Sequence, residues 1–318
     1  MAHRPLMTHP ATLAGLGAAA LGVTALVVSI RARQAEKDNP PTGRLIDVDG
    51  VRVHYAELGR GEPLVLLHGN GSMLQDFMSS GFVREAAKSY RVIAFDRPGY
   101  GYSDRPRSTI WTPAAQAELL RSALHQIGVA RALVLGHSWG ASVAIALALD
   151  HPEMVRGLIL ESGYYYASVR ADVVLMSGPA VPLVGDILRY TVSPPVARLM
   201  WPAMIRKLFS PAPVAATFAG VPSEMAIRPS QLRASAAESA LMIPDAVAVQ
   251  GRYGELEMPI AIVAGSGDKI VDVDDQAVRL HRELPTSSLH VVEGCGHMVH
   301  HTAPRDVMAA VDAVALAA

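Results

Sequence analysis

Short apolar runs that alternate with helix-length segments limit, more than any other feature, how this 318-residue chain can fold. Such runs are typical of strands buried on both faces, and they occupy residues 63–67, 91–95, 132–135, 157–160, 259–264 and 288–292. Helical patterns occupy residues 76–89, 113–127, 141–150, 274–284 and 304–317. Ahead of them, residues 44–58 alternate apolar and polar side chains around Asp49-Gly50 and predict a hairpin. The alternation predicts an α/β fold with a mostly parallel sheet flanked by helices on both faces.

Composition excludes several classes of protein. Half of the residues are hydrophobic and 18% are charged, which excludes a disordered or purely solvating chain. The net charge of -1 gives no reason to expect nucleic acid as a partner, because a phosphate backbone calls for a concentrated basic face. Cys295 is the single cysteine, so neither an intramolecular disulfide nor a cysteine-based zinc site is available. We interpret Cys295 as a small packed residue rather than a nucleophile, because a nucleophilic cysteine needs a base and an orienting partner.

The N-terminal segment differs from the rest of the chain. Residues 11–30 carry no charge, and a helix of this length rises about 30 Å, the thickness of a bilayer's hydrocarbon layer. We expect a membrane anchor, with a cleaved signal peptide or a peripheral helix as alternatives. The basic residues that follow, Arg31, Arg33 and Lys37, favour a cytoplasmic main domain, whereas signal cleavage would leave a secreted or periplasmic one. Residues 34–43 are polar and predict a linker, so residues 1–43 are anchor and linker.

One long interval interrupts the alternation of strands and helices. Residues 44–163 and 255–318 form the predicted core, whereas residues 164–254 are rich in proline and predict an inserted helical cap. Tyr164, at the start of this interval, is expected to enter the cleft. Other apolar cap residues are expected to form much of the pocket wall, and they include Val173, Val174, Leu175, Met176, Trp201, Phe209 and Phe218.

Residues 136–140 carry the pattern G-x-S-x-G between a buried strand and a helix. Glycines permit a tight strand-to-helix turn that exposes the hydroxyl of Ser138. A serine in this position requires a base, and the base must itself be oriented by an acid. The alternative, an ordinary serine near a helix N-terminus, does not account for the buried strand that precedes it.

The acid and the base are expected in the loops after two later strands. Asp268 follows the strand at 259–264, and His297 follows the strand at 288–292. Both loops leave the carboxyl edge of the sheet, where Ser138 also lies. The chain order Ser, Asp, His therefore predicts a catalytic triad of Ser138, Asp268 and His297. Neighbouring groups remain alternatives, namely Asp272 and Glu161 for the acid and His300 and His301 for the base.

Acyl transfer also needs donors for the developing oxyanion. We predict the main-chain N–H groups of Trp139 and Asn70, with Gly71 as the alternative to Asn70. The glycines of residues 68–72 let this loop approach the substrate closely. Pocket residues are expected at Gly69, Gly71, His137 and Tyr164, although the His137 side chain should point away from the cleft. This chemistry calls for no metal and no cofactor.

From about residue 44 to its end, the chain resembles the α/β-hydrolase family. The resemblance is to the serine-nucleophile branch, similar to haloperoxidase-like, epoxide-hydrolase-like and dehalogenase-like hydrolases. Its motifs lie in the family's order at residues 68–71, 95–103, 136–140, 265–268 and 294–297. The resemblance implies an eight-stranded sheet, a lid after the sixth strand and no cofactor.

One departure from those relatives narrows the chemistry. Haloalkane dehalogenases and epoxide hydrolases place aspartate where this chain has Ser138. Asn70 and Trp139 resemble the halide-holding pair of dehalogenases, but with serine we expect main-chain oxyanion donors, with the Trp139 indole lining the pocket. We expect hydrolysis of a small or medium hydrophobic carboxylic ester through an acyl-enzyme. Perhydrolase, haloperoxidase-like or aminopeptidase activity on the same triad remains open, as does a non-catalytic ligand-binding protein.

Overall fold

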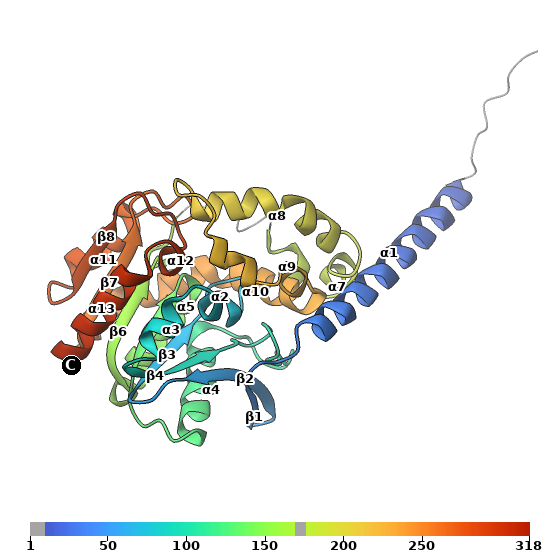
Figure 1. Cartoon of the computed structure of the whole chain (residues 1–318). Helices are drawn as coiled ribbons and strands as arrows, with labels where there is room; N and C mark the ends of the chain where they lie inside the picture. The colour runs from blue at the N-terminus through green and yellow to red at the C-terminus, as the bar shows by residue number, and fades with distance from the viewer. Residues whose placement is uncertain (1–9, 169–175) are drawn as a thin grey trace, which may run out of the picture.

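The computed structural model describes residues 10–168 and 176–318, and its centre is one eight-stranded sheet (Figure 1). The strand order is β1-β2-β4-β3-β5-β6-β7-β8. β1 pairs antiparallel with β2 and β2 antiparallel with β4, whereas every other pair is parallel. The strands are β1 Arg44–Val48, β2 Val51–Leu58, β3 Glu62–Leu67, β4 Tyr90–Phe95, β5 Ala132–His137, β6 Val155–Glu161, β7 Ile260–Gly265 and β8 Ser288–Val292. The predicted fold class is confirmed.

Side-chain alternation along β3 divides the core into two layers. Val65 and Leu67 pack on one face of the sheet, with α4 (Pro113–Gln126) and α5 (Trp139–Asp150). Leu64 and Leu66 pack on the other face, with α3 (Phe82–Ala86) and α13 (Pro304–Ala317). Since both faces of the central strands are covered, these strands are continuous apolar runs rather than alternating ones.

Two predicted helices are interrupted. The segment predicted as one helix at 76–89 forms α2 (Gln75–Ser79) and α3, separated at Gly81, whose φ of 88° ends the helical path. The segment predicted at 274–284 begins as the π-helical turn η5 (Asp274–Val278) and continues as α11 (Arg279–Glu283). α12 (Val299–Thr302) is a short helix between β8 and α13.

The N-terminal helix α1 (Pro10–Asp38) extends away from the sheet (Figure 1). It is long and apolar enough to cross a membrane, a test that N-terminal signal sequences also pass. The predicted linker begins too early, because residues 34–38 are still helical. Gln34 donates a hydrogen bond to Asp38, one turn later, and Ala35 is buried against Met73 and Met225.

Residues 162–259, which we call the cap, connect β6 to β7, and their described helices lie over the end of the sheet (Figure 1). The predicted boundary at 164 falls in the loop after β6, and that at 254 falls within η4. Val173, Val174 and Leu175 lie outside the described residues. The described cap elements are η2 Gly178–Ala180, α7 Val184–Leu188, α8 Ser193–Phe209, η3 Ala216–Gly220, α9 Ser223–Ala226, α10 Pro229–Val249 and η4 Gln250–Glu255.

Candidate active site

Ser138 lies in the tight turn between β5 and α5. Its φ of 54° and ψ of -120° are strained for a residue with a side chain. The turn depends on two glycines: a Cβ on Gly140 would lie 2.0 Å from the carbonyl oxygen of Leu67, and a Cβ on Gly136 would lie 2.4 Å from that of Gly140. The half-buried Ser138 is thereby presented at the carboxyl edge of the sheet.

Asp268 and His297 are joined by a hydrogen bond. The distance from His297 Nδ1 to Asp268 Oδ2 is 2.7 Å. The side chain of His297 is 4% exposed and that of Asp268 is 1% exposed. The other carboxylate oxygen accepts the main-chain N–H groups of Ile270 and Val271. Burial alone would raise the pKa of Asp268, but the imidazole of His297 and these hydrogen bonds outweigh it and lower that pKa. The ionised carboxylate thus accepts a hydrogen bond from the Nδ1–H of His297, which leaves Nε2 as the unprotonated nitrogen that can act as a base.

The turn that carries Ser138 adjoins the loop that carries His297. His137 Nε2 donates to the carbonyl oxygen of His297 over 3.1 Å, and the two rings lie 4.9 Å apart between centroids. No hydrogen bond joins the Ser138 hydroxyl to His297, although the structure describes both residues. Such bonds are often long in enzymes without substrate and tighten when it binds.

The alternative acids and bases have other partners. Asp272 is exposed and accepts the main-chain N–H of Asp275. Glu161 binds His300 instead of His297. His301 binds Asp76, a residue that the sequence patterns did not single out. Among the predicted groups, Asp268 is therefore the carboxylate that contacts His297.

The loop after β3 lies directly against Ser138. A Cβ on Gly69 would lie 3.1 Å from the Ser138 Cβ, so the absence of a side chain permits this contact. Among the described residues, no hydrogen bond uses the main-chain N–H of Asn70 or of Trp139. Gly71, the alternative donor, has its N–H 3.5 Å from the Tyr100 hydroxyl. Asn70 and Trp139 thus retain free donors beside Ser138.

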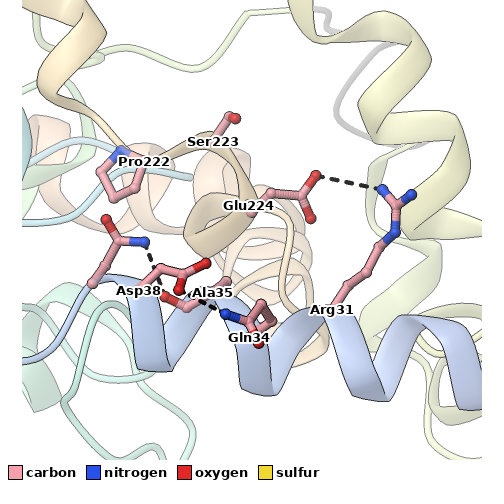
Figure 2. Close-up of a pocket in the computed structure, with 8 residues that line it drawn as sticks. Arg31, Gln34, Ala35, Asp38, Pro222, Ser223 and Glu224 are labelled. Carbon is pink, nitrogen blue, oxygen red and sulfur yellow. Dashed lines mark hydrogen bonds and ion pairs between the residues drawn. The ribbon is translucent and has the colours of Figure 1, made fainter.

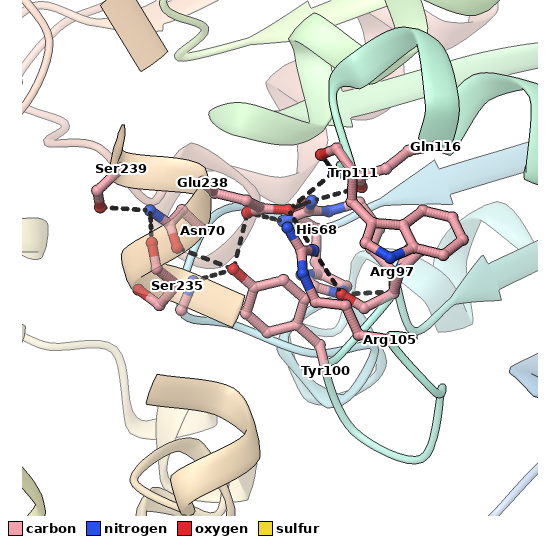
Figure 3. A network of polar contacts seen from close by, with 12 residues as sticks. His68, Asn70, Arg97, Tyr100, Arg105, Trp111, Gln116, Ser235, Glu238 and Ser239 are labelled. Carbon is pink, nitrogen blue, oxygen red and sulfur yellow. Dashed lines mark hydrogen bonds and ion pairs between the residues drawn. The ribbon is translucent and has the colours of Figure 1, made fainter. Parts of the chain in front are cut away.

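The buried guanidinium of Arg97 fixes the peptide that supplies the Asn70 donor (Figure 3). Its Nη2 donates to the carbonyl oxygen of Gly69 over 2.9 Å, and its Nε donates to that of His68 over 2.7 Å. In a trans peptide, the C=O of one residue and the N–H of the next point in opposite directions. The N–H of Asn70 therefore points away from Arg97. Sequence reasoning used Arg97 only as part of a family motif and missed this role.

Helix α10 of the cap supplies the counterion of Arg97. Glu238 forms an ion pair with the guanidinium, and both side chains are fully buried (Figure 3). Burial alone would raise the pKa of Glu238, but the charge of Arg97 and its hydrogen bonds lower it. The side-chain Nδ2 of Asn70 donates to the carbonyl oxygen of Ser235 and to the hydroxyl of Ser239 on the same helix. The cap and the predicted oxyanion loop are thus held together.

A second buried network centres on His300. Glu161 accepts both the main-chain N–H and the Nδ1–H of His300, at 2.8 and 2.7 Å. On the other side of the ring, Nε2 lies 3.4 Å from Asp76 Oδ1. Burial would lower the pKa of His300, but the two carboxylates raise it to about 10. His300 is therefore a buried cation between two anions.

This His300 network connects three loops of the site. The carbonyl oxygen of Glu161 accepts the N–H of Ser138 at 2.8 Å, and Asp76 accepts the hydroxyl of Ser72 at 2.9 Å. His300 itself follows His297 by three residues. Its members also have the residue types of metal ligands, in the groups Asp76-His300-His301 and His137-Glu161-His300. Ion pairs and hydrogen bonds account for this arrangement, so we interpret it as a structural connection.

The side chains of Trp139, His137 and Tyr164 are all buried, as was expected of His137. The indole of Trp139 is 2% exposed and packs in the core with other side chains of α5, so its contact with the pocket stays a prediction. His137 lies beneath the Ser138 turn, and burial lowers its pKa to about 3. Tyr164 is buried and, with Asp268 and Gln276, borders a cavity of about 440 Å³ whose lining does not include Ser138.

The cap makes direct contact with the loop of His297. The carbonyl oxygen of Leu208, near the end of α8, accepts the His297 N–H at 2.8 Å. Phe209 and Phe218 pack beside Met298, with Trp201 partly buried next to them. These predicted wall residues thus pack against the loop of His297, whereas Met176 is exposed. Cys295 is buried in the same loop, as expected of a small packed residue.

Comparison with known proteins gives consistent matches. The family model described as alpha/beta hydrolase fold matches residues 62–304. The chain is 36% identical over 127 residues to 2-hydroxymuconate semialdehyde hydrolase of Pseudomonas sp. (strain CF600), a match that spans 40% of this chain and less than half of that hydrolase (45%). It is 29% identical over 253 residues to 2-hydroxy-6-oxononadienedioate/2-hydroxy-6-oxononatrienedioate hydrolase 2 of Pseudomonas putida, covering 78% of this chain and 85% of that protein.

Among solved structures, the chain is similar to a membrane phospholipase A that is described as a bacterial virulence factor. The TM-score is 0.67 and the identity 23%, and the match covers 95% of this chain and 96% of that structure. At this level of identity, the likeness shows a shared fold.

Replacing Arg97 with lysine should slow turnover without greatly weakening substrate binding. Lysine retains the charge opposite Glu238 but cannot donate simultaneously to the carbonyl oxygens of His68 and Gly69. We expect kcat to fall roughly 10- to 100-fold, which is less than the complete loss of one oxyanion donor typically causes. KM should change little. Steady-state kinetics measure this, with Arg91→Lys on the surface as the matched control. An unchanged kcat in folded Arg97→Lys would contradict the assigned role.

His300 should make the stability of the fold depend on pH in the alkaline range. Because its pKa rises from 6.5 to about 10 on folding, its contribution is complete below about pH 6.5 and is lost as the pH rises towards 10. We expect the difference in unfolding free energy between the wild type and His300→Gln to shrink over this range. Urea denaturation at pH 6, 8 and 10 measures it, with His125→Gln on an exposed part of α4 as control. A constant difference would mean that the ring is neutral in the folded protein.

Proposed function

The chain belongs to the α/β-hydrolase fold family, and from this premise we propose that it is a serine hydrolase that cleaves a hydrophobic carboxylic ester. The observation that carries the proposal is the 2.7 Å hydrogen bond between Asp268 and His297, beside a strained turn that presents Ser138. A general base oriented by a buried carboxylate is what a serine hydroxyl needs to become a nucleophile.

The proposed reaction has two halves. His297 Nε2 takes the Ser138 proton as the serine oxygen bonds to the ester carbon, and the oxyanion accepts hydrogen bonds from Asn70 and Trp139. His297 then gives the proton to the departing alkoxide, which leaves as the alcohol, and Ser138 remains acylated. In the second half, His297 takes a proton from water, the resulting hydroxide displaces the acid, and the proton returns to Ser138. Asp268 stabilises the imidazolium in both halves.

Relatives favour a second candidate substrate on the same triad. The similar Pseudomonas proteins are named as hydrolases of 2-hydroxymuconate semialdehyde and of 2-hydroxy-6-oxo dienedioates, which are unsaturated hydroxy-oxo compounds. A substrate of that kind would use the same oxyanion donors. The apolar side chains that surround the base loop, including Phe209 and Phe218, favour the hydrophobic ester as the first candidate.

We also propose that α1 anchors the protein in a membrane through residues 11–30. Its apolar residues are mostly exposed, and an uncharged, exposed helix of this length is expensive to hold in water. The basic residues Arg31, Arg33 and Lys37 follow the apolar segment and favour a cytoplasmic catalytic domain.

Ser138→Ala should abolish hydrolysis across a panel of substrates. The panel contains p-nitrophenyl esters of increasing acyl length, an aminoacyl amide, a peracid-forming assay and 2-hydroxymuconate semialdehyde. We expect the best substrate to be an ester, and its kcat to fall by roughly 10⁴-fold or more in Ser138→Ala. Ser142→Ala, one turn further along α5, is the matched control and should stay active. A Ser138→Ala variant that retains most of its activity would refute the nucleophile, and a preference for the semialdehyde would favour the second candidate.

A further inference from the structure

Several exposed apolar side chains lie on two helices of the cap, on or directly before α7 and on α8. The exposed fraction is 79% at Leu183 and 82% at Leu199. We call this group the apolar cap face and define it by Leu183, Val184, Ile187, Val196, Leu199 and Met200. Because large contiguous apolar patches are uncommon on soluble monomers, such a face usually marks an interaction surface.

Helix α8 turns different sides outward and inward along its length. Val196, Leu199 and Met200 follow the spacing of one helical stripe and are all exposed. Near the C-terminal end, Ile205 and Phe209 point inward and are buried beside the His297 loop. The same helix therefore presents an apolar stripe to the outside and contacts the proposed base with its other end.

A series of ion pairs connects α8, which carries part of the apolar cap face, to the C-terminal part of α1. Glu224 of α9 forms a two-pronged pair with Arg198 of α8, at 2.6 and 2.8 Å, and lies 3.9 Å from Arg31 of α1. Figure 2 shows Arg31 and Glu224 facing each other across a cavity of about 400 Å³. Arg31 is the first charged residue after the apolar segment, and Leu199 directly follows Arg198. The exposed stripe of α8 therefore begins beside the point where the apolar segment of α1 ends.

Part of the folded domain also packs against the apolar segment of α1. Val28 is 3% exposed, whereas its neighbours Val27 and Ile30 are 45% and 56% exposed. One side of α1 is thus already covered by protein before the apolar segment ends. If α1 spans a bilayer, the part of the body beside Val28 reaches the depth of the lipid headgroups.

We propose that the apolar cap face lies on the phospholipid bilayer that α1 spans and forms a second, peripheral membrane contact. A lipid surface fits better than a protein partner because this face continues from a helix that is itself apolar and exposed. The exposed Arg206 and Lys207 on the last turn of α8 are suited to anionic headgroups. The inference rests on the proposed anchoring by α1.

This placement also names a class of substrate. α8 would touch lipid through Leu199 and touch the His297 main chain through Leu208, so the two ends of one helix connect the bilayer to the base. Acyl esters dissolved in the bilayer are the substrates that such a contact would favour. This step depends in addition on the proposed hydrolase activity.

Depth-dependent quenching of fluorescence tests the membrane contact without using activity. The full chain carries an environment-sensitive fluorophore on one introduced cysteine, Leu199→Cys, Leu21→Cys on α1 or Glu153→Cys on the exposed η1 turn (Pro152–Met154), because the native Cys295 is buried. Each protein is reconstituted into phosphatidylcholine and phosphatidylglycerol vesicles that contain a nitroxide-labelled phospholipid. We expect the nitroxide to quench the labels at positions 199 and 21 and to leave the label at 153 bright.

The outcomes separate the inference from the proposals it rests on. Quenching at 21 without quenching at 199 overturns the apolar cap face as a lipid contact but keeps the anchor. Quenching at neither position overturns both. The label at position 199 could instead become shielded from water as the protein concentration rises, without being quenched by the lipid nitroxide. That result also overturns the lipid contact, since a second copy of the chain would then cover the apolar cap face.

A pair of substitutions tests the substrate class. Leu183→Glu with Leu199→Glu should reduce hydrolysis of a long-chain ester dissolved in vesicles at least fivefold, while hydrolysis of a water-soluble short-chain ester stays within twofold of wild type. Equal loss on both substrates would contradict a role in substrate delivery. Absence of ester hydrolysis in the wild type would instead refute the proposed function and leave the quenching result as the test of the membrane contact.

Discussion

The burial of one positive charge, on Arg97, governs how the cap, the sheet and the predicted oxyanion loop fit together. A fully buried guanidinium is tolerated only when it is paired and all its donors have acceptors. Both carboxylate oxygens of Glu238, the side-chain oxygen of Gln116 and the carbonyl oxygens of His68 and Gly69 together meet that requirement. Removing one partner of such a pair typically costs about 3–5 kcal/mol, because the other charge stays buried. The cap is therefore part of the site rather than an added cover.

The second buried charge, on His300, holds other loops of the site in place, as Arg97 holds the predicted oxyanion loop. Glu161 contacts the Ser138 turn through its main chain and His300 through its side chain. Asp76 extends the network to the loop after β3. Catalytic groups must be held within a fraction of an ångström to be effective, and these buried ion pairs and hydrogen bonds hold the loops that carry the proposed catalytic residues.

The sequence was sufficient to predict the order of strands and helices along the chain. It was also sufficient to predict which loops carry Ser138, Asp268 and His297. These depend on local patterns: apolar runs, glycines in a turn and residues directly after strands. It was insufficient where partners are distant, as for Arg97 and Glu238 or Glu161 and His300, because no local pattern shows which buried charges meet. Gly81 was also overlooked as a break in a helical segment, and the burial of Trp139 depended on how α5 packs against the sheet.

The nucleophilic role of Ser138 is the claim on which the proposed function depends, and covalent labelling tests it most directly. The full chain is treated with a fluorophosphonate, digested, and the modified peptide sequenced by mass spectrometry. The account predicts one phosphonylated residue, Ser138, and loss of labelling in His297→Gln. Labelling at another residue, or unchanged labelling of Ser138 in His297→Gln, would contradict it.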